Sequence, residues 1–340
     1  MSAARLELTR EQLLAYRRTV QSLDERLPWG DASLRRAAWA GLQDSMPRAA
    51  LLQIHARVEG AGPAAWEAPS LVQLWGPRFS VYVVDQRDLA AFSLGRHPDD
   101  PRGRAVADDL AARLRVAIGD RTVLHDDAAA ALGVPANRLR YAATTGTLLI
   151  RWGGARQATL RLVTAPEVDA ATARLELARR HLHVFGATTP AAFAEWAGIG
   201  PREAAAAFDG LAAELVPVRT PIGDRWILTA DLPAFRAPAP EPAAARLLPS
   251  GDAYYLLQGA DRELLVPEAG PRAALWTSRV WPGAVLVRGD VVGTWRRAGA
   301  KLTVETWRRL SADERQAVER EAEALPLPDL AGRIQVDWGP

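Results

Sequence analysis

The predicted fold is decided by a short turn near the N-terminus, Gly41-Leu42-Gln43-Asp44-Ser45-Met46-Pro47-Arg48. Residues 32–40 before it and residues 47–58 after it carry apolar positions at helical spacing, so the turn joins two amphipathic helices. This arrangement predicts a helix-turn-helix. Pro47 falls in the first turn of the second helix, where a missing N–H is harmless, and Ser45 is then the expected N-cap.

Composition excludes several classes of protein. With 340 residues and 49% hydrophobic content, the chain can form two to four compact units with real cores. It contains no run of about 18 uncharged apolar residues and its N-terminus lacks a signal-peptide core, so we expect no membrane contact and a cytoplasmic, nucleoid-associated protein. There is no cysteine, and His181 and His183 lie two apart in a helical stretch, so neither a metal nor another cofactor is expected.

The charge is balanced at +2, but its composition is unusual. Lys301 is the only lysine, so nearly every cation is an arginine. The guanidinium fork suits phosphate groups, which is compatible with nucleic-acid binding. A coding bias toward arginine and alanine would give the same excess, and composition does not separate the two explanations.

The first predicted unit covers residues 1–118 and contains the turn. A helix is expected over 5–27, a short helix around Leu71 to Leu74, and a strand over 78–84. Residues 85–118 are mostly helical in pattern.

The second predicted unit, residues 119–168, has the element order of a winged helix. A helix runs from His125 through Leu132, a second covers 137–145, and a hairpin follows with Gly153-Gly154 at its turn.

This unit carries the most informative charge pattern. From Ala128 to Pro166 there is no acidic residue, whereas five cations are present: Arg138, Arg140, Arg151, Arg156 and Arg161. Amide and aromatic side chains lie between them, as phosphate-backbone contact requires. The alternative is that these arginines neutralise acids elsewhere in the fold. We favour the interpretation in which they face DNA, because so long an acid-free span cannot pair its own cations locally.

Two further units complete the expected architecture. Residues 169–236 repeat the helix, helix, hairpin order, but acidic residues on the second helix indicate a packing element. After a stiff Ala/Pro linker, residues 246–340 carry alternating runs typical of strands, and Ser311 and Glu314 form a capping box for a last helix. The alternating runs cover 254–257, 263–266, 284–287, 291–297 and 301–307. The predicted fold class is α+β, with tandem winged-helix modules followed by a small C-terminal β-barrel-like domain.

Several segments together resemble one known family. The turn and the residues after it read Gly-Leu-Gln-x-x-x-Pro-Arg-Ala-Ala-Leu over 41–51, and 189–196 read Thr-Pro-x-x-Phe-Ala-x-Trp. With the segments 246–249 and 291–296 of the C-terminal part, they are similar to AlkZ-like winged-helix DNA glycosylases. The resemblance implies an enzyme that cuts alkylated or crosslinked bases from DNA. The family motif is usually Gln-x-Gln or Gln-x-Asp, whereas this chain has Gln43-Asp44-Ser45.

The chemistry of that reaction suggests roles for the three residues. Hydrolysis of an N-glycosidic bond needs a water held near C1′, and a base alkylated at a ring nitrogen leaves without a strong proton donor. Gln43 is the candidate for orienting the water, and Asp44 and Ser45 are candidates for holding it or for steadying the cationic sugar. The alternative is purely structural, with Ser45 as N-cap, Asp44 as a helix-start charge and Gln43 as a surface residue.

The leading functional prediction is therefore a monofunctional DNA glycosylase, a hydrolase that grips damaged double-stranded DNA. The residues expected to contact DNA are Arg48, Asn137, Arg138, Arg140, Tyr141, Arg151, Trp152, Arg156 and Gln157. This hypothesis requires Gln43 and the arginine cluster to face one groove. The first alternative is a non-catalytic winged-helix DNA-binding protein, such as a lesion sensor or a transcriptional regulator, and the second is a protein-interaction scaffold. The sequence leaves protein partners open.

Overall fold

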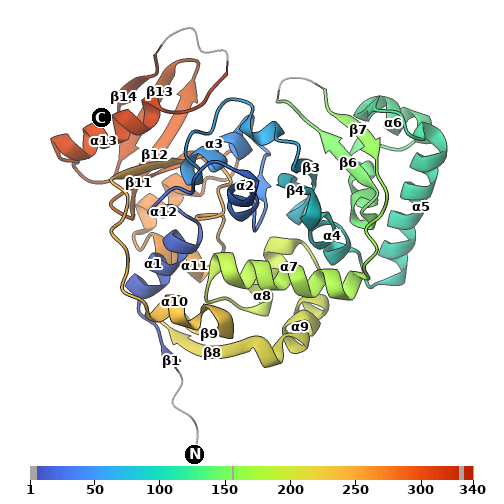
Figure 1. Cartoon of the computed structure of the whole chain (residues 1–340), viewed down its shortest axis with the longest axis horizontal. Helices are drawn as coiled ribbons and strands as arrows, with labels where there is room; N and C mark the ends of the chain where they lie inside the picture. Colours follow the sequence, from blue (N-terminus) through green and yellow to red (C-terminus); the bar gives the residue numbers. More distant parts are fainter. Residues whose placement is uncertain (1–5, 155–156, 329–332, 340) are drawn as a thin grey trace, which may run out of the picture.

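Helices and small sheets alternate along the chain in an α+β fold (Figure 1). The computed structural model describes residues 6–154, 157–328 and 333–339. Its first part contains β1 (Leu6–Glu7), α1 (Arg10–Val20), α2 (Asp31–Ala37), β2 (Leu42–Gln43), α3 (Ala49–Arg57), η1 (Ala65–Glu67), β3 (Leu71–Trp75), η2 (Pro77–Phe79), β4 (Val81–Asp85), η3 (Gln86–Asp88), α4 (Leu89–Phe92) and η4 (Leu94–Arg96). The helix predicted over 5–27 is shorter than expected, because Thr9 and Gln12 form a capping box that starts α1 and the helix ends at Val20.

A three-stranded sheet with the order β2-β4-β3 lies within this first part. The predicted helix-turn-helix therefore contains a strand inside its turn, and β2 pairs antiparallel with β4. The helix predicted around Leu71 to Leu74 is wrong, because this segment is strand β3. Four of its five residues are buried, and a strand buried on both faces shows a continuous apolar run that periodicity cannot separate from a helix.

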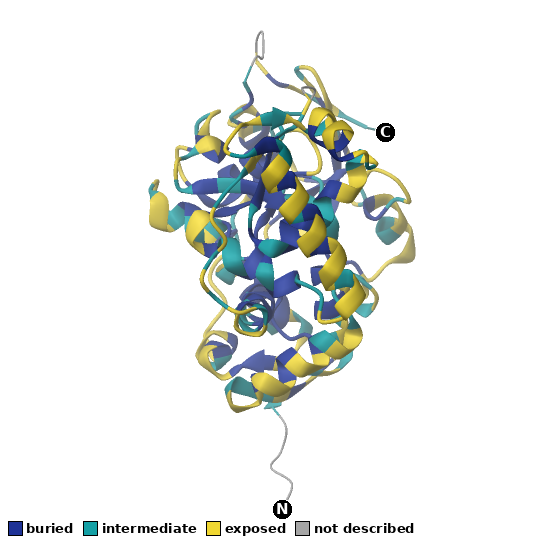
Figure 2. Ribbon diagram, turned by 90° about the vertical axis from the view of Figure 1, so that its right-hand side faces the viewer, coloured by how far each residue is buried: buried dark blue, intermediate teal, exposed yellow. Residues whose placement is uncertain are grey.

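The second part has the predicted order of helix, turn, helix and hairpin. It contains α5 (Pro101–Ile118), β5 (Val123–Leu124), α6 (His125–Leu132), the 3-10 helix η5 (Ala136–Thr145), β6 (Leu148–Arg151) and β7 (Thr159–Leu162). The hairpin joins β5 in a sheet with the order β5-β7-β6. Helix α5 packs on this core through Ala107, Leu110, Leu114 and Ile118, and its opposite face is exposed (Figure 2).

The third part supplies the central helix of the molecule. It contains α7 (Ala170–Phe185), α8 (Pro190–Ala197), α9 (Pro201–Gly210), η6 (Ala212–Glu214), β8 (Leu215–Thr220), β9 (Gly223–Leu228), η7 (Thr229–Asp231) and α10 (Leu232–Arg236). Leu177, Ala178 and Leu182 of α7 belong to a core cluster that also includes residues of β4 and of the segment 253–257. The N-terminal strand β1 pairs parallel with β8, so the start of the chain is attached to this part.

The C-terminal part is built on a five-stranded sheet in the linear order β10-β11-β12-β13-β14. Its elements are β10 (Ala245–Leu248), α11 (Ala260–Leu265), α12 (Ala269–Leu275), β11 (Gly283–Val287), β12 (Asp290–Ala298), β13 (Lys301–Thr306), α13 (Ala312–Glu323) and β14 (Gln335–Trp338). A linear order is that of an open sheet, and the predicted closure into a barrel is not confirmed. The division into four separate units also stays a prediction.

Sequence patterns in the C-terminal part were informative for strands in hairpins and misleading elsewhere. The runs at 284–287, 291–297 and 301–307 form β11, β12 and β13, and the capping box of Ser311 and Glu314 begins α13. The strands predicted at 254–257 and 263–266 are wrong: the first has no strand, and the second lies in and just after helix α11. Arg10 donates to the carbonyls of Leu264 and Leu265 at 2.7 and 3.2 Å, and so satisfies acceptors at the end of that helix.

A buried ion pair ties α3 to the C-terminal part. Both terminal nitrogens of Arg57 donate to the carboxylate of Asp252 at 2.7 Å, and the two side chains are 2% and 0% exposed. Arg57 also donates to Gln21 Oε1 at 2.9 Å, and Asp252 accepts the N–H of Tyr254. The pair therefore holds residues 249–257 against the end of α3.

We expect Asp252→Ala to lower the free energy of unfolding by about 3–5 kcal/mol, because it leaves the Arg57 guanidinium buried and unpaired. Arg333→Ala is the matched control. It removes an exposed pair with Glu323 and is expected to cost less than about 1 kcal/mol. Urea unfolding followed by circular dichroism measures both, and equal costs for the two variants would contradict the prediction.

Candidate active site

Gln43 lies on strand β2 directly opposite Tyr82 of β4. Opposed residues of antiparallel strands share one face of a sheet, and the Tyr82 hydroxyl donates to Gln43 Oε1 at 3.4 Å. Gln43 Nε2 in turn donates to the Ser45 hydroxyl at 3.2 Å. Burial raises the pKa of Tyr82 to about 12, so its hydroxyl stays protonated and donates at neutral pH. The amide of Gln43 is thereby oriented, with one N–H and one lone pair left for a further partner.

Three glycines make room for this arrangement. A Cβ atom at Gly41 or at Gly76 would lie 2.8 Å from the ring of Tyr82, so the ring fits only between two residues without side chains. A Cβ atom at Gly251 would lie 3.2 Å from the amide carbon of Gln43, and Gly251 has a φ of +80°. The segment that Asp252 anchors therefore packs directly on the Gln43 amide.

Asp44 is turned into the protein and is only 3% exposed. Its Oδ1 accepts the N–H of Ala50 at 3.0 Å, and its Oδ2 accepts Gln73 Nε2 at 2.7 Å. Asp44 thus satisfies one of the first N–H groups of α3.

Ser45 is therefore not the N-cap that the sequence predicted. Helix α3 begins at Ala49, so the N-cap position is Arg48, in the left-handed region with a φ of 68°, and Ser45 and Pro47 both lie before the helix. The hydroxyl of Ser45 instead accepts the amide of Gln43.

Burial is the largest influence on the Asp44 carboxyl group and raises its pKa to about 7. The N–H of Ala50, the amide of Gln73 and the guanidinium groups of Arg48 and Arg151 oppose this rise. The carboxyl group consequently changes its charge near neutral pH.

The hairpin of β6 and β7 packs on the Gln43 turn. Gln73 uses both ends of its amide: Oε1 accepts the N–H of Trp152 at 2.8 Å, while Nε2 donates to Asp44 and also lies 3.2 Å from the Trp152 carbonyl. Arg48 Nη1 donates to the Gly153 carbonyl at 3.4 Å, and Gly154 packs against Pro47. Figure 1 shows the hairpin and the C-terminal sheet on opposite sides of α3.

Two of the predicted DNA-contacting arginines meet on one aromatic ring beside this junction. The guanidinium groups of Arg48 and Arg151 lie 5.4 and 4.1 Å from the ring centroid of Trp66. Arg151 also forms an ion pair with Glu67. Arg151 therefore has an acidic partner outside the acid-free span, and its contact with DNA stays a prediction.

The other predicted contacts divide into two groups. Trp152 belongs to the part of the hairpin that packs on the Gln43 turn, Gln157 is exposed further along the hairpin, and Arg156 lies outside the described residues. Arg138, Arg140, Tyr141 and Asn137 belong to η5. Arg140 lies 5.3 Å from the ring of Phe79, and Tyr141 meets the same ring edge-on at 5.0 Å. No hydrogen bond or ion pair in the described part of the chain joins this η5 group to Gln43.

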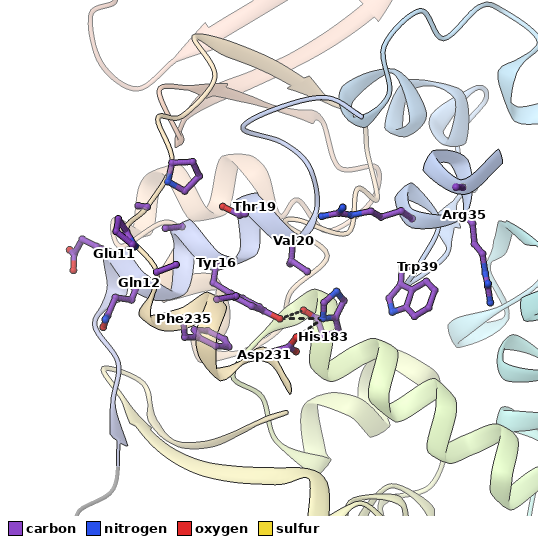
Figure 3. Close-up of a pocket in the computed structure, with 18 of the residues that line it drawn as sticks. Glu11, Gln12, Tyr16, Thr19, Val20, Arg35, Trp39, His183, Asp231 and Phe235 are labelled. Atoms are coloured by element: carbon purple, nitrogen blue, oxygen red, sulfur yellow. Dashed lines mark hydrogen bonds and ion pairs between the residues drawn. The ribbon is translucent and has the colours of Figure 1, made fainter. Parts of the chain in front are cut away.

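An apolar cavity of about 740 Å³ lies elsewhere, between α1, α2 and α10 (Figure 3). Tyr16, Phe235 and Trp39 contribute to its walls, and His183 Nδ1 lies 2.8 Å from Asp231 within it. It contains none of the predicted site residues.

The sequence did not predict this cavity, and near the turn it did not predict the roles of the Gln53 and Gln73 amides. Gln53 donates to the Gln43 carbonyl at 2.7 Å, a contact between residues ten positions apart that no local pattern announces.

Within the described ranges, no group of three or more His, Cys, Asp or Glu side chains is arranged to hold a metal ion. Likewise, no helix there has both the length and the apolar character to cross a membrane.

Comparison with known proteins places the chain in a family. The model of the AlkZ-like DNA glycosylase family matches residues 34–326. A search of curated proteins finds no significant match. Among solved structures, the DNA glycosylase AlkZ of Streptomyces sahachiroi is similar, with a TM-score of 0.79 and 19% identity over 98% of this chain and 100% of that one. At that identity the structural match shows a shared fold alone. Because the family model spans most of the sequence, this protein belongs to the AlkZ-like DNA glycosylase family.

Proposed function

We propose that the protein is a DNA glycosylase that removes alkylated bases from double-stranded DNA, with Gln43 as the residue that orients the attacking water. Membership of a DNA glycosylase family supports the general reaction and a DNA substrate. The observation that carries the assignment to Gln43 is its oriented amide beside the hairpin, where Trp152 and the Arg48 and Arg151 cations gather.

In this reaction the water oxygen bonds to C1′ while the bond from C1′ to the base nitrogen breaks. The electron pair of that bond neutralises the positive charge of an N-alkylated base, so the leaving group needs no proton. The attacking water gives up one proton to bulk solvent, which leaves a neutral hydroxyl group on C1′. Gln43 needs only to hold the water, through its remaining N–H or lone pair. Tyr82 and Ser45 fix the rotation of the amide, which places the water before the reaction begins.

Asp44 has a different role from Gln43. Both of its oxygens face donors inside the protein, so it is a positioning residue that acts through the backbone of the turn. Its negative charge still favours a cationic sugar nearby, because burial reduces the screening of that charge by water.

A non-catalytic DNA-binding protein is the second candidate function. Both polar atoms of the Gln43 amide already have partners within the protein, and position 45 carries a hydroxyl where the family motif has an amide or carboxylate. This candidate predicts salt-dependent DNA binding without release of any base.

Base release from a duplex containing N7-methylguanine separates the two candidates. Alkali after incubation converts abasic sites into strand breaks, which are counted on a gel. We expect Gln43→Ala to slow single-turnover release by roughly a hundredfold, because the water is no longer held. Gln316→Ala removes an exposed amide of α13 and serves as the control. Wild-type protein that binds the duplex and releases nothing would establish the second candidate.

Tyr82→Phe tests the orientation of the amide. The variant loses only the hydroxyl that donates to Gln43, so the ring still fits between Gly41 and Gly76. The expected result is a release rate lowered by about tenfold at unchanged duplex affinity. A variant that weakens duplex binding and leaves the single-turnover rate intact would show that Tyr82 does not act through Gln43.

The Asp44 carboxyl group gives a pH dependence of known sign. Its pKa is raised to about 7 in the folded protein, so the carboxylate that accepts both hydrogen bonds is lost as pH falls from 8 to 6, and release should slow over that range. The free energy of unfolding changes in the opposite direction, because a raised pKa means that the folded protein favours the protonated carboxyl group. The stabilisation from this group is fully present below about pH 4 and is lost as pH rises to about 7.

Asp44→Asn is the comparison that isolates these effects. Release rates and urea midpoints of the two proteins are measured between pH 5 and 8. The wild type should show both pH dependences, and Asp44→Asn should show neither, because its amide does not titrate in this range. Parallel curves for the two proteins would refute the assignment to Asp44.

A further inference from the structure

The apolar cavity between α1, α2 and α10 has a volume of about 740 Å³, which is the size of a small-molecule site. The rings of Tyr16 and Phe235 are almost buried and stack at a centroid distance of 3.7 Å, so they form its base. Val20 and Trp39 are partly exposed and form its sides (Figure 3). The exposed segment 237–240 lines its mouth, and two prolines stiffen that segment. An aromatic molecule would therefore meet a preformed apolar surface.

A second cavity, of about 530 Å³, adjoins the first. Trp39, His183 and Asp231 line both cavities, so these three residues lie between them. The ring of Trp39 meets that of His183 edge-on at a centroid distance of 6.5 Å. The His183 side chain is 36% exposed, so a molecule in the cavity can reach it.

His183 presents an oriented nitrogen atom to this space. Its Nδ1 lies 2.8 Å from Asp231 Oδ1, and a carboxylate only accepts hydrogen bonds, so Nδ1 carries the hydrogen. The Tyr16 hydroxyl donates to the His183 carbonyl at 2.8 Å. The other ring nitrogen, Nε2, has no hydrogen-bond partner among the described residues and is accessible to solvent. With the hydrogen on Nδ1, the neutral imidazole offers Nε2 as an acceptor, which calls for a ligand that donates.

The charged side chains of the wall do not favour a charged ligand. Arg35 and Arg87 both pair with aspartates outside the cavity. Arg36 and Glu11 form no ion pair within the described ranges, but both are exposed and their charges are opposite. A charged ligand would lose hydration here without gaining an uncompensated counter-charge, so the wall favours a neutral one.

We propose that this cavity binds a neutral, planar aromatic compound whose hydroxyl group donates to His183 Nε2. The ring of such a phenol packs on Trp39 and Val20, and its hydroxyl supplies the donor that Nε2 lacks. The cavity contains no residue of the Gln43 turn, so binding there is independent of the proposed function.

The test compares two probes on the full chain at pH 7. 2-Naphthol has a hydroxyl group, whereas 2-methoxynaphthalene has the same rings and no donor. Calorimetry and the shift in melting temperature are the readouts. We expect 2-naphthol to bind about tenfold more tightly, because only its hydroxyl can donate to Nε2. Two charged analogues, 2-naphthoate and 2-naphthylmethylamine, should both bind more weakly than 2-naphthol. Equal affinity for 2-naphthol and its ether, or tighter binding of either charged analogue, would overturn the proposal.

Variants locate the bound compound. Ala234→Trp adds a large side chain at an exposed position of the cavity wall and should weaken 2-naphthol binding at least about tenfold. Ala112→Trp, the same change on the exposed face of α5, is the control and should bind as the wild type does. His183→Phe keeps a ring but loses Nε2, so it should bind 2-naphthol and its ether equally. If that variant does not fold, the two probes on the wild type still decide.

Gln43→Ala should bind 2-naphthol as the wild type does, whether or not the protein releases bases. Wild-type protein that does not bind 2-naphthol, or equal affinities of Ala234→Trp and Ala112→Trp for it, would contradict the assignment to this cavity.

Discussion

One buried carboxylate fixes the geometry of the Gln43 turn. Asp44 accepts the N–H of Ala50 on one oxygen and the amide of Gln73 on the other, and Gln73 accepts the N–H of Trp152 at its far end. The turn, strand β3 and the hairpin are thereby joined, although they are far apart in the sequence. Because a buried carboxylate without donors costs several kcal/mol, each segment holds the others in register.

The Gln43 side chain is oriented mainly by packing, whereas the backbone of the turn is fixed by the hydrogen bonds of Asp44. The ring of Tyr82 is confined between Gly41 and Gly76, its hydroxyl donates to the Gln43 amide, and Gly251 packs on the same amide. The segment carrying Gly251 is fixed in turn by the buried pair of Arg57 and Asp252. An amide held on several sides loses little entropy when it orients a water, which is the advantage of a preorganised site.

Local patterns predicted the elements that local chemistry determines. The capping box of Ser311 and Glu314 and the hairpin after η5 were readable because their signals lie within a few residues of each other. The short strands β2 and β3 were not. Strand β3 is buried without alternation and so resembles a piece of helix, and β2 has only two residues, too few to show a period within the predicted turn.

The same distinction between local signals and tertiary contacts applies to the candidate active site. The importance of the turn could be predicted from the family resemblance, but its internal geometry could not. Ser45 is not the N-cap because α3 begins only at Ala49, and Arg151 pairs with Glu67, which lies 84 positions earlier. The roles of Gln73 and Gly251 depend on tertiary contacts that a single sequence does not display.

The most direct measurement is an experimental structure of the Gln43→Ala variant bound to a duplex in which a 2′-fluoro sugar stabilises N7-methylguanine. The proposed function requires C1′ of the modified nucleotide to lie within the reach of one water from residue 43, with the hairpin and Trp152 against the same duplex. A modified base held in the cavity lined by Tyr16 and Phe235, or a duplex on a face remote from residue 43, would contradict it.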